Sequence, residues 1–250
     1  MTKSEIKYYS SLLQKKYRSK EKKFLAEGKR LVEEGLRSGS ECEIIFITKE
    51  FKTRFSEFLR PLNIHSEVIT NSEFNKISDT KNPQGVTAVF KMKEHPSFDL
   101  SSSLIIGLED ISDPGNIGTI LRSCDWFGVK DIIVDDKCAD VYNPKTIRSS
   151  MGAVFHLNIF VTGNIYEELR LLKKENAFAI ITADMNGENL YKFDFPRNSA
   201  VIFCNETNGP SEKLLELSNH KVTIPKFGKV ESLNVANAAS IILSNYKLKK

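Results

Sequence analysis

Residues 224–242, IPKFGKVESLNVANAASII, offer polar groups in a setting where a ligand can come close. A helix is predicted to open at Ser232 and Asn234, whose hydroxyl and amide groups stand beside the free backbone donors of its first turn. The alanines and serine that follow are small, so a ligand or another backbone can approach. Taken alone, however, the segment is explained by a cap at Ser232 and ordinary packing of the alanines.

Two more segments place polar residues directly after predicted strands. The strand SLIIGLE leads into DISDPGNIGTILRSCDWFGV, where Asn116 can cap a helix that carries Arg122 two turns in. The strand AVIF leads into CNETNGPSEKL, a turn with Glu206 at its tip. Simple structural explanations exist for each residue, namely a cap at Asn116, a surface ion pair between Arg122 and Asp125, and an exposed turn position at Glu206.

These segments belong to a part of the chain in which strands and helices alternate. Strands are predicted at 104–108, 131–134, 157–161, 178–182, 200–203 and 221–224, with helical stretches between them. This alternation predicts an α/β fold with a mostly parallel sheet covered on both faces. Ligands of such sheets bind outside the carboxyl ends of the strands, where all three polar segments fall. Spacing alone does not show that the segments meet.

The sequence changes character near residue 95. Residues 5–92 contain a basic helix, the helical pattern FLAEGKRLVEEGL and the strands EIIFIT and GVTAVFKM. The polar segment KEHPSFDLSSS that follows has the composition of a linker. We therefore predict a small α/β domain at 1–94, a linker at 95–102 and a second α/β domain at 103–250.

Composition argues against several classes of protein. The 250 residues are 40% apolar and 27% charged, which is typical of a globular protein that folds in water. No run of eighteen apolar residues occurs and the start MTKSEIKYYS lacks the apolar core of a signal peptide, so a cytoplasmic location without membrane contact is expected. The four Cys form no CxxC pair and the four His are far apart, so neither a metal site nor a disulfide framework is expected.

Positive charge is concentrated at the amino-terminal end. The first 30 residues contain ten Lys or Arg and three Glu, so they carry +7 although the whole chain carries only +4. A concentrated basic segment is typical of proteins that bind polyanions such as nucleic acids. The same charges would also simply keep a surface helix solvated, and charge alone does not separate these interpretations.

Taken together, the three polar segments resemble the SpoU (TrmH) branch of the SPOUT RNA methyltransferases. The first is similar to the family motif D-P-x-N-x-G-x-x-x-R (113–122), the second is C-N-E-T-N-G (204–209), and the third is similar to I-P-x-x-G-x-x-E-S-L-N-V-A (224–236). Residues 142–157 are also similar to the family. FLAEGKRLVEEGL and NPQGVTAVF resemble the small substrate-binding domain that often precedes the catalytic domain. The resemblance covers almost the whole chain.

The resemblance implies transfer of a methyl group from S-adenosylmethionine to a ribose 2′-hydroxyl of RNA. Ribosomal RNA is favoured over transfer RNA because of the front domain. Arg122 is expected to contact a phosphate of the target nucleotide or to help activate its hydroxyl, and the other catalytic residues implied are Asn116, Glu206, Ser232 and Asn234. The cofactor is expected at Thr182, Cys204, Asn205, Gly209, Ile224, Pro225, Ser232 and Leu233. RNA is expected at Lys15, Lys16, Arg18, Lys29, Arg30 and Arg148.

The resemblance also implies a SPOUT α/β fold with a carboxyl-terminal trefoil knot, and homodimers that pair through the knotted region. Two residues depart from the family pattern, because Cys204 and Thr207 stand where the second motif, G-N-E-G-x-G, usually has glycines. Each replacement could narrow the cofactor loop. An RNA-binding accessory protein without turnover is therefore an alternative. A Rossmann enzyme is disfavoured because only G-N-I-G occurs after the first strand of the second domain.

Overall fold

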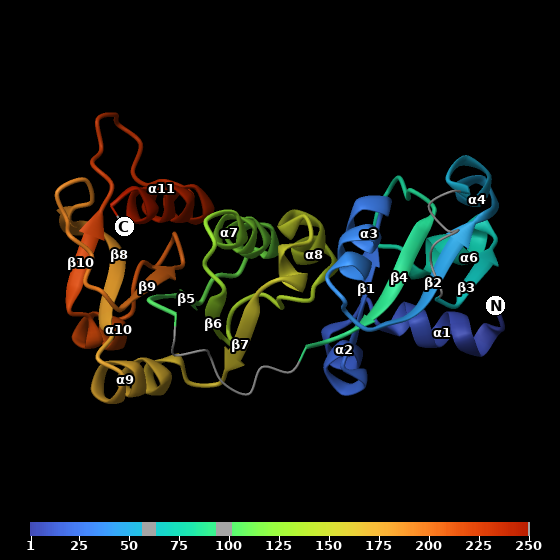
Figure 1. Ribbon diagram of the computed structural model, residues 1–250, viewed down its shortest axis with the longest axis horizontal. Coiled ribbons are helices and arrows are strands. Elements are labelled where there is room, and N and C mark those ends of the chain that lie inside the picture. Colours follow the sequence, from blue (N-terminus) through green and yellow to red (C-terminus); the bar gives the residue numbers. More distant parts are fainter. Residues whose placement is uncertain (57–63, 94–101, 250) are drawn as a thin grey trace. The chain divides into compact units, whose positions relative to one another are not determined.

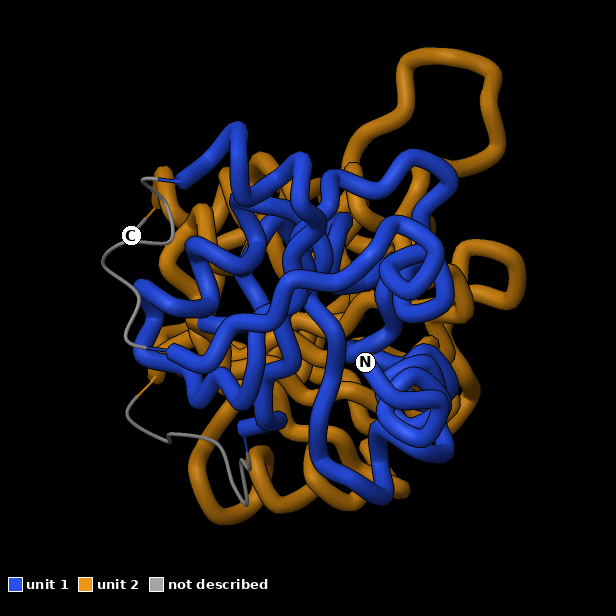
Figure 2. The backbone as a smooth tube through the Cα atoms, turned by 90° about the vertical axis from the view of Figure 1, so that its right-hand side faces the viewer, with its two compact units in different colours: residues 1–94, 140–155 blue, residues 95–139, 156–250 orange. Residues whose placement is uncertain are grey.

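The structure, a computed structural model, describes residues 1–56, 64–93 and 102–249 (Figure 1). The chain forms two compact units, one of residues 1–94 with 140–155 and one of residues 95–139 with 156–250 (Figure 2). The linker predicted at 95–102 lies outside the described residues, apart from Ser102. The first unit thus takes a segment, 140–155, from the middle of the second predicted domain.

A mixed four-stranded sheet forms the centre of the first unit. Its strands lie in the order β1-β4-β2-β3, with β4 antiparallel to both neighbours and β2 parallel to β3. The strands are β1 (Lys23–Glu27), β2 (Cys42–Thr48), β3 (Ser66–Ile69) and β4 (Val86–Lys91). The helices are α1 (Lys3–Ser11), α2 (Lys15–Glu21), α3 (Lys29–Arg37), α4 (Lys49–Arg54), α6 (Asn71–Ile77), α8 (Pro144–Ser150) and the 3₁₀ turn η1 (Ala153–Phe155).

The segment FLAEGKRLVEEGL differs from its predicted conformation. Its first residues form the strand β1, and only the part from Lys29 onward is helical. Phe24, Leu25 and Ala26 are buried in the sheet and pair with β4. This pairing outweighs the helical spacing of the apolar residues in the segment as a whole. Gly28, at φ +105°, then turns the chain from strand into helix, a conformation that side chains with a Cβ rarely adopt.

The second unit contains a six-stranded sheet in the order β10-β8-β9-β5-β6-β7. Each neighbouring pair is parallel, which confirms the predicted α/β fold with a parallel sheet. The strands are β5 (Leu104–Glu109), β6 (Asp131–Asp135), β7 (Asn158–Thr162), β8 (Ala179–Asn189), β9 (Ser199–Cys204) and β10 (His220–Thr223). β8 runs further than the predicted 178–182, and its pairing with β10 shifts register between Lys221 and Val222.

Helices cover both faces of this sheet. The helices are α7 (Pro114–Trp126), α9 (Ile165–Glu175), α10 (Glu212–Leu217) and α11 (Val235–Leu248). α9 and α10 pack one core cluster against the sheet, and α7 and α11 lie together on the other side (Figure 1). In the described part of the chain, no helix has the length and apolar character needed to cross a membrane.

Candidate active site at the carboxyl ends of the parallel strands

The loops that follow β5, β9 and β10 are joined by three polar side chains. Asn116 Nδ2 donates to Glu206 Oε1 at 2.7 Å. Asn234 Nδ2 donates to Asn116 Oδ1 at 2.9 Å and to Glu206 Oε1 at 3.1 Å. The backbone N–H of Val235 also donates to Glu206 Oε1, at 3.2 Å. One residue from each polar segment therefore enters a single cluster of hydrogen bonds, which we call the Asn–Glu–Asn cluster (Asn116, Glu206 and Asn234).

Asn116 enters this cluster because another residue caps its helix. Asp113 is the N-cap of α7, and its Oδ1 accepts a hydrogen bond from Asn116 N at 3.0 Å. Pro114 occupies the first helical position, where its missing N–H costs nothing. The interpretation of Asn116 as the cap is therefore wrong. Its side chain is directed instead to the loops after β9 and β10.

Asn234 both caps its helix and takes part in the cluster, two roles that the sequence left open. It is the N-cap of α11, and its Oδ1 accepts hydrogen bonds from Ala236 N at 3.0 Å and Asn237 N at 3.4 Å. Its Nδ2 faces the other way, toward Asn116 and Glu206. The helix thus begins at Val235, and the prediction that it opens at Ser232 is wrong.

Hydrogen bonds of the Asn205 side chain and a glycine at 209 shape the loop that carries Glu206. Asn205 Nδ2 donates to the carbonyl of Asp110 at 2.9 Å, and Asn205 Oδ1 accepts from Thr207 N at 2.8 Å. Among the described residues, Thr207 is not one of those with positive φ, so no glycine is required there. Position 209 does require a glycine, since the φ of Gly209 is +64°.

Cys204 lies beneath this loop and not within it. It ends β9, is 8% exposed and belongs to the core cluster under α9 and α10. Burial, with the Glu109 carboxylate nearby, raises the pKa of its thiol far above the usual range. The Cys204 side chain therefore fills core space and stays protonated, so neither departure from the family motif strains the loop backbone.

Arg122 stands apart from the cluster. It is exposed on α7, and among the described residues no ion pair involves it, so the alternative explanation of Arg122 as the partner of Asp125 is wrong. Residues six apart point about 120° away from each other around a helix, so Arg122 and Asn116 are on different faces of α7. Ser232 and Leu233 are also exposed, and no hydrogen bond between described residues joins Ser232 to the cluster.

Three predicted cofactor residues lie in β8 or directly after its neighbour β10, the edge strand of the sheet. Thr182 is buried, and its hydroxyl is 2.5 Å from that of Ser218. Beside it, a cavity of about 300 Å³ is lined by Asn186, Gly187, Glu188, Leu215, Ser218, Asn219, His220 and Lys221. The lining includes none of the predicted cofactor residues. Ile224 and Pro225 are half-buried where the chain leaves β10.

The predicted RNA-binding residues fall into two groups. Lys15, Lys16 and Arg30 are exposed. Arg18 is instead 2% exposed: its Nη2 is 2.6 Å from Asp140 Oδ2, and its Nη1 donates to the Leu12 carbonyl at 2.8 Å.

This geometry corrects the interpretation of Arg18, because a buried guanidinium bound to a carboxylate is not available to phosphate. Arg148 is also engaged, with its Nη2 2.9 Å from Asp79 Oδ2, and Lys29 Nζ lies 3.9 Å from Glu33. In the described part of the chain, no group of three His, Cys, Asp or Glu side chains is arranged to hold a metal ion.

Comparison with known proteins gives matches over both units. The model of the SpoU rRNA Methylase family matches residues 103–244, and the model of the MRM3-like substrate binding domain matches residues 3–88. The 23S rRNA (guanosine(2553)-2′-O)-methyltransferase RlmP of Bacillus subtilis is 34% identical over 239 residues, covering 96% of this chain and 94% of that protein.

Solved structures match over nearly the full length as well. A putative RNA methyltransferase of the TrmH family from Porphyromonas gingivalis has a TM-score of 0.88 at 30% identity, covering 100% of this chain and 99% of its own. The SpoU methyltransferase AviRb from Streptomyces viridochromogenes, solved in complex with AdoMet, has a TM-score of 0.89 at 27% identity, covering 99% and 98%. The predicted family resemblance is confirmed.

Proposed function

Because the chain belongs to the SpoU rRNA methylase family, we propose that it transfers a methyl group from S-adenosylmethionine to a ribose 2′-hydroxyl of ribosomal RNA. The observation that carries this proposal is the Asn–Glu–Asn cluster, in which each of the three motif segments contributes one side chain. Motif residues that merely capped or packed their own elements would not meet in this way. The full-length match to a 23S rRNA methyltransferase favours ribosomal RNA.

The chemistry explains why these residues would be needed. S-adenosylmethionine supplies an activated methyl group, and transfer requires the attacking ribose oxygen to lie in line with the carbon–sulfur bond. Much of the rate therefore depends on positioning. The Asn–Glu–Asn cluster fixes the three loops relative to one another, and Glu206 also accepts from the first turn of α11. Arg122 is exposed and has no ion-pair partner among the described residues. Its guanidinium is therefore suited to bind a phosphate of the substrate and to favour loss of the proton from the ribose 2′-hydroxyl.

The loop residues fit the cofactor. A Cβ added at Gly209 would meet no atom within 4 Å, so space is open beside the backbone of that turn. The half-buried Ile224 and Pro225 and the exposed Ser232 and Leu233 flank the same loops and provide backbone donors and acceptors. We assign the predicted set to cofactor binding, with Cys204 at the end of β9 and Thr182 within β8 acting through the strands that they belong to.

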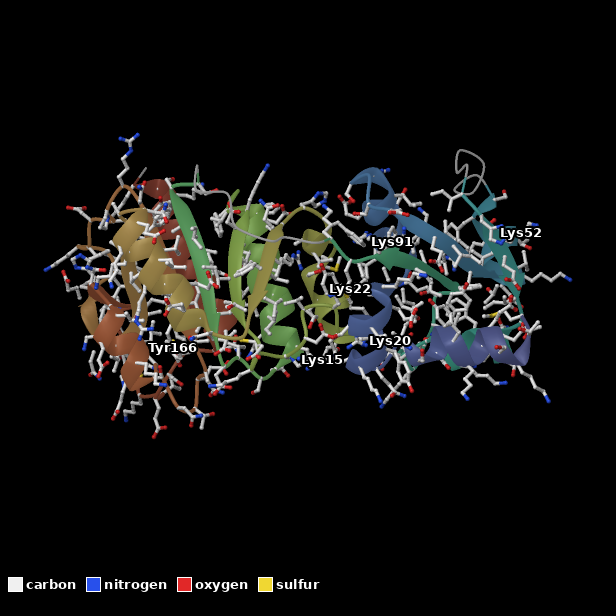
Figure 3. The ribbon with its side chains drawn as sticks, turned by 90° about the horizontal axis from the view of Figure 1, so that it is seen from below. Lys15, Lys20, Lys22, Lys52, Lys91 and Tyr166 are labelled. Atoms are coloured by element: carbon white, nitrogen blue, oxygen red, sulfur yellow. The ribbon has the colours of Figure 1, made fainter. Side chains whose placement is uncertain are left out.

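The RNA surface that we propose centres on α2. Lys15, Lys16 and Lys20 on this helix and Lys22 directly after it are exposed. Figure 3 labels Lys15, Lys20 and Lys22. Lys22 has left-handed backbone geometry, with φ 53°, and Lys20 Nζ lies 3.9 Å from Glu21 Oε1. Arg18, bound to Asp140, anchors the helix from below. These four lysines replace Arg18 as the phosphate contacts, and the exposed Arg30 extends the set.

A transfer assay with radiolabelled S-adenosylmethionine tests the function. The protein should label ribosomal RNA from cells that lack the gene, and mapping should place the methyl group on one ribose. Transfer RNA is tested as the second substrate. Label found only in transfer RNA would contradict the assignment to ribosomal RNA. Binding of RNA without any transfer would instead identify an accessory protein.

The salt dependence of RNA binding tests the α2 surface. Replacing the four lysines by Gln should lower the slope of log K against log salt by about 3, since each phosphate contact contributes about 0.7–0.9. The matched control removes the same charge from four other exposed lysines of the first unit, at Lys49, Lys52, Lys76 and Lys81. Equal slopes for the two quadruple variants would show that α2 is only solubilising.

We also propose a homodimer that pairs through α7 and α11. These helices lie side by side, with the hydroxyls of Ser123 and Ser240 2.7 Å apart. Trp126, at the end of α7, is 82% exposed and offers a large apolar side chain to a partner. Light scattering should give twice the monomer mass of 28.3 kDa, and Trp126→Glu should give a monomer. A wild-type monomer at micromolar concentration would contradict the proposal.

The trefoil knot implied by the family is likewise a proposal. It is supported by the long connection from β10 to α11, which brings Val235 against the loop after β9. A protein unfolded by pulling on its two ends should then stop short of its full extended length, because the knot tightens without opening. The ribosomal RNA substrate that we propose for this chain favours a cytoplasmic location, which fractionation would check.

A further inference from the structure

Glu109 is a buried carboxylate beside the candidate site, and it was not singled out from the sequence. It ends β5 and is only 4% exposed. The sequence signal was nevertheless present, since an acidic residue closes an otherwise apolar strand. A carboxylate buried in this way is costly unless hydrogen bonds compensate for the lost water.

Three neutral donors provide that compensation. Ser211 donates to Glu109 twice, from its hydroxyl to Oε1 at 2.5 Å and from its backbone N–H to Oε2 at 3.2 Å. The Tyr166 hydroxyl donates to Oε1 at 2.8 Å and lies 3.1 Å from the Ser211 hydroxyl. Among the described residues, no ion pair includes Glu109. We call Glu109, Tyr166 and Ser211 the Glu–Tyr–Ser cluster.

Tyr166 reaches this cluster from α9 (Figure 3). Burial, together with the Glu109 carboxylate, raises the pKa of Tyr166. Its hydroxyl therefore remains protonated at neutral pH and keeps donating. The ring also packs against the core cluster beneath the sheet, so the position of the hydroxyl is fixed by packing.

The Glu–Tyr–Ser cluster holds one end of the loop that carries Glu206. At the start of this loop, Asn205 is bonded to the carbonyl of Asp110, and at its end Ser211 is bonded to Glu109. Glu109 and Asp110 are consecutive, so the carboxyl end of β5 is hydrogen-bonded to both ends of the loop 205–211. Glu206 lies between the two grips and joins the Asn–Glu–Asn cluster.

We propose that Glu109 is a positioning residue for the methyl transfer, acting through Ser211 and Tyr166 to fix the loop 205–211 that binds the cofactor and presents Glu206. This inference rests on the proposed function. A purely structural carboxylate would support the sheet without setting the geometry of this loop.

The chain contains a carboxylate of that second kind, which gives a matched control. Asp131 is 1% exposed at the opposite, amino-terminal end of the neighbouring strand β6. It accepts from Asn158 Nδ2 at 3.1 Å and from the hydroxyl of Ser102. Asp131→Asn therefore also removes from the same sheet a buried carboxylate that accepts from a hydroxyl. This carboxylate lies at the opposite end of the strands from the loop 205–211.

The experiment compares Glu109→Gln with Asp131→Asn in the full chain. Glutamine keeps one acceptor oxygen but turns a donor toward Ser211 or Tyr166, so one of their hydrogen bonds is lost. The readouts are the Kd for S-adenosylmethionine by calorimetry without RNA, hydrogen exchange of the amides at 205–211, and the melting temperature. Tyr166→Phe removes a single donor and serves as the milder variant if Glu109→Gln does not fold.

Glu109→Gln should raise the Kd about tenfold, as expected for the loss of one charge-assisted hydrogen bond, and should speed exchange at 205–211. Asp131→Asn should lower the melting temperature while leaving the Kd and loop exchange unchanged. Equal Kd and loop exchange in Glu109→Gln and wild type would overturn the inference. If the wild type transfers no methyl group, the proposed function fails, whereas exchange at 205–211 still tests the loop.

Discussion

Substituting Asn234 can separate the stability that it gives from its part in the site. Its Oδ1 caps α11, and its Nδ2 holds Asn116 and Glu206. Asn234→Ser keeps a good cap but loses the amide donor, whereas Asn234→Ala loses both. Loss of the cap costs about 1 kcal/mol, or about 2–4 °C in melting temperature for a chain of this size. Serine should therefore melt close to wild type and alanine a few degrees lower.

Both variants should lose activity to a similar extent. The hydrogen bond from Nδ2 to the Glu206 carboxylate, at 3.1 Å, is charge-assisted. Such a bond contributes about 1.5–3 kcal/mol, so kcat should fall by about 10- to 150-fold if the energy acts on loop geometry in the transition state. Steady-state kinetics with radiolabelled S-adenosylmethionine and unmodified ribosomal RNA would measure this.

A cap outside the site provides the control. Asn164 caps α9, with its Oδ1 accepting from Glu167 N at 3.3 Å, and it has no contact with the cluster. Asn164→Ser should leave both kcat and melting temperature unchanged. Wild-type kcat in Asn234→Ser, or an activity loss seen only in Asn234→Ala, would refute the reasoning and reduce Asn234 to a cap.

Further substitutions address the arginines and the cysteines. Arg122→Ala should cut kcat by orders of magnitude at unchanged melting temperature and cofactor Kd, because the side chain is exposed; unchanged turnover would remove it from the mechanism. Arg18→Ala should lower the free energy of unfolding by about 3–5 kcal/mol in urea titrations, since Asp140 is left without its partner, and a stability near wild type would argue against the buried pair. Cys204→Gly, which restores the family residue, should cost about 1–2 kcal/mol without tightening the cofactor Kd, because the side chain packs in the core. Burial raises the pKa of Cys138 to about 12, so this thiol stays protonated at pH 8 and should react with iodoacetamide only after unfolding, as mass spectrometry would show.

Much of the second unit was predictable because its signals are local. Strands that are apolar along their whole length alternate with helices, which predicts a parallel sheet, and β5, β6, β7 and β9 lie close to their predicted positions. The strand β1 was missed because the apolar residues of FLAEGKRLVEEGL recur at helical spacing. Only the pairing with β4 shows that Phe24–Ala26 are extended.

The site was predictable in its parts and not in its connections. Asn116, Glu206 and Asn234 could be named from the motifs, but their hydrogen bonds join residues 28 to 118 positions apart. Asp113 directly before Pro114 is a local signal for a cap at Asp113, but nothing local indicates that the side chain of Asn116 is then directed to the other loops. The burial of Arg18 was equally invisible, because its partner Asp140 lies 122 positions away in a segment expected to belong elsewhere.

That same segment, 140–155, determines how separable the two units are. The chain leaves and re-enters the first unit there, so the units are tied by three covalent passages and not by one tether. Cleavage between residues 94 and 102 would leave residues 1–94 held only by their non-covalent packing against 140–155, for example by the pair of Arg18 and Asp140. A fragment that starts at residue 103 would carry Asp140 without Arg18, so it would lack a buried ion pair that the full chain has.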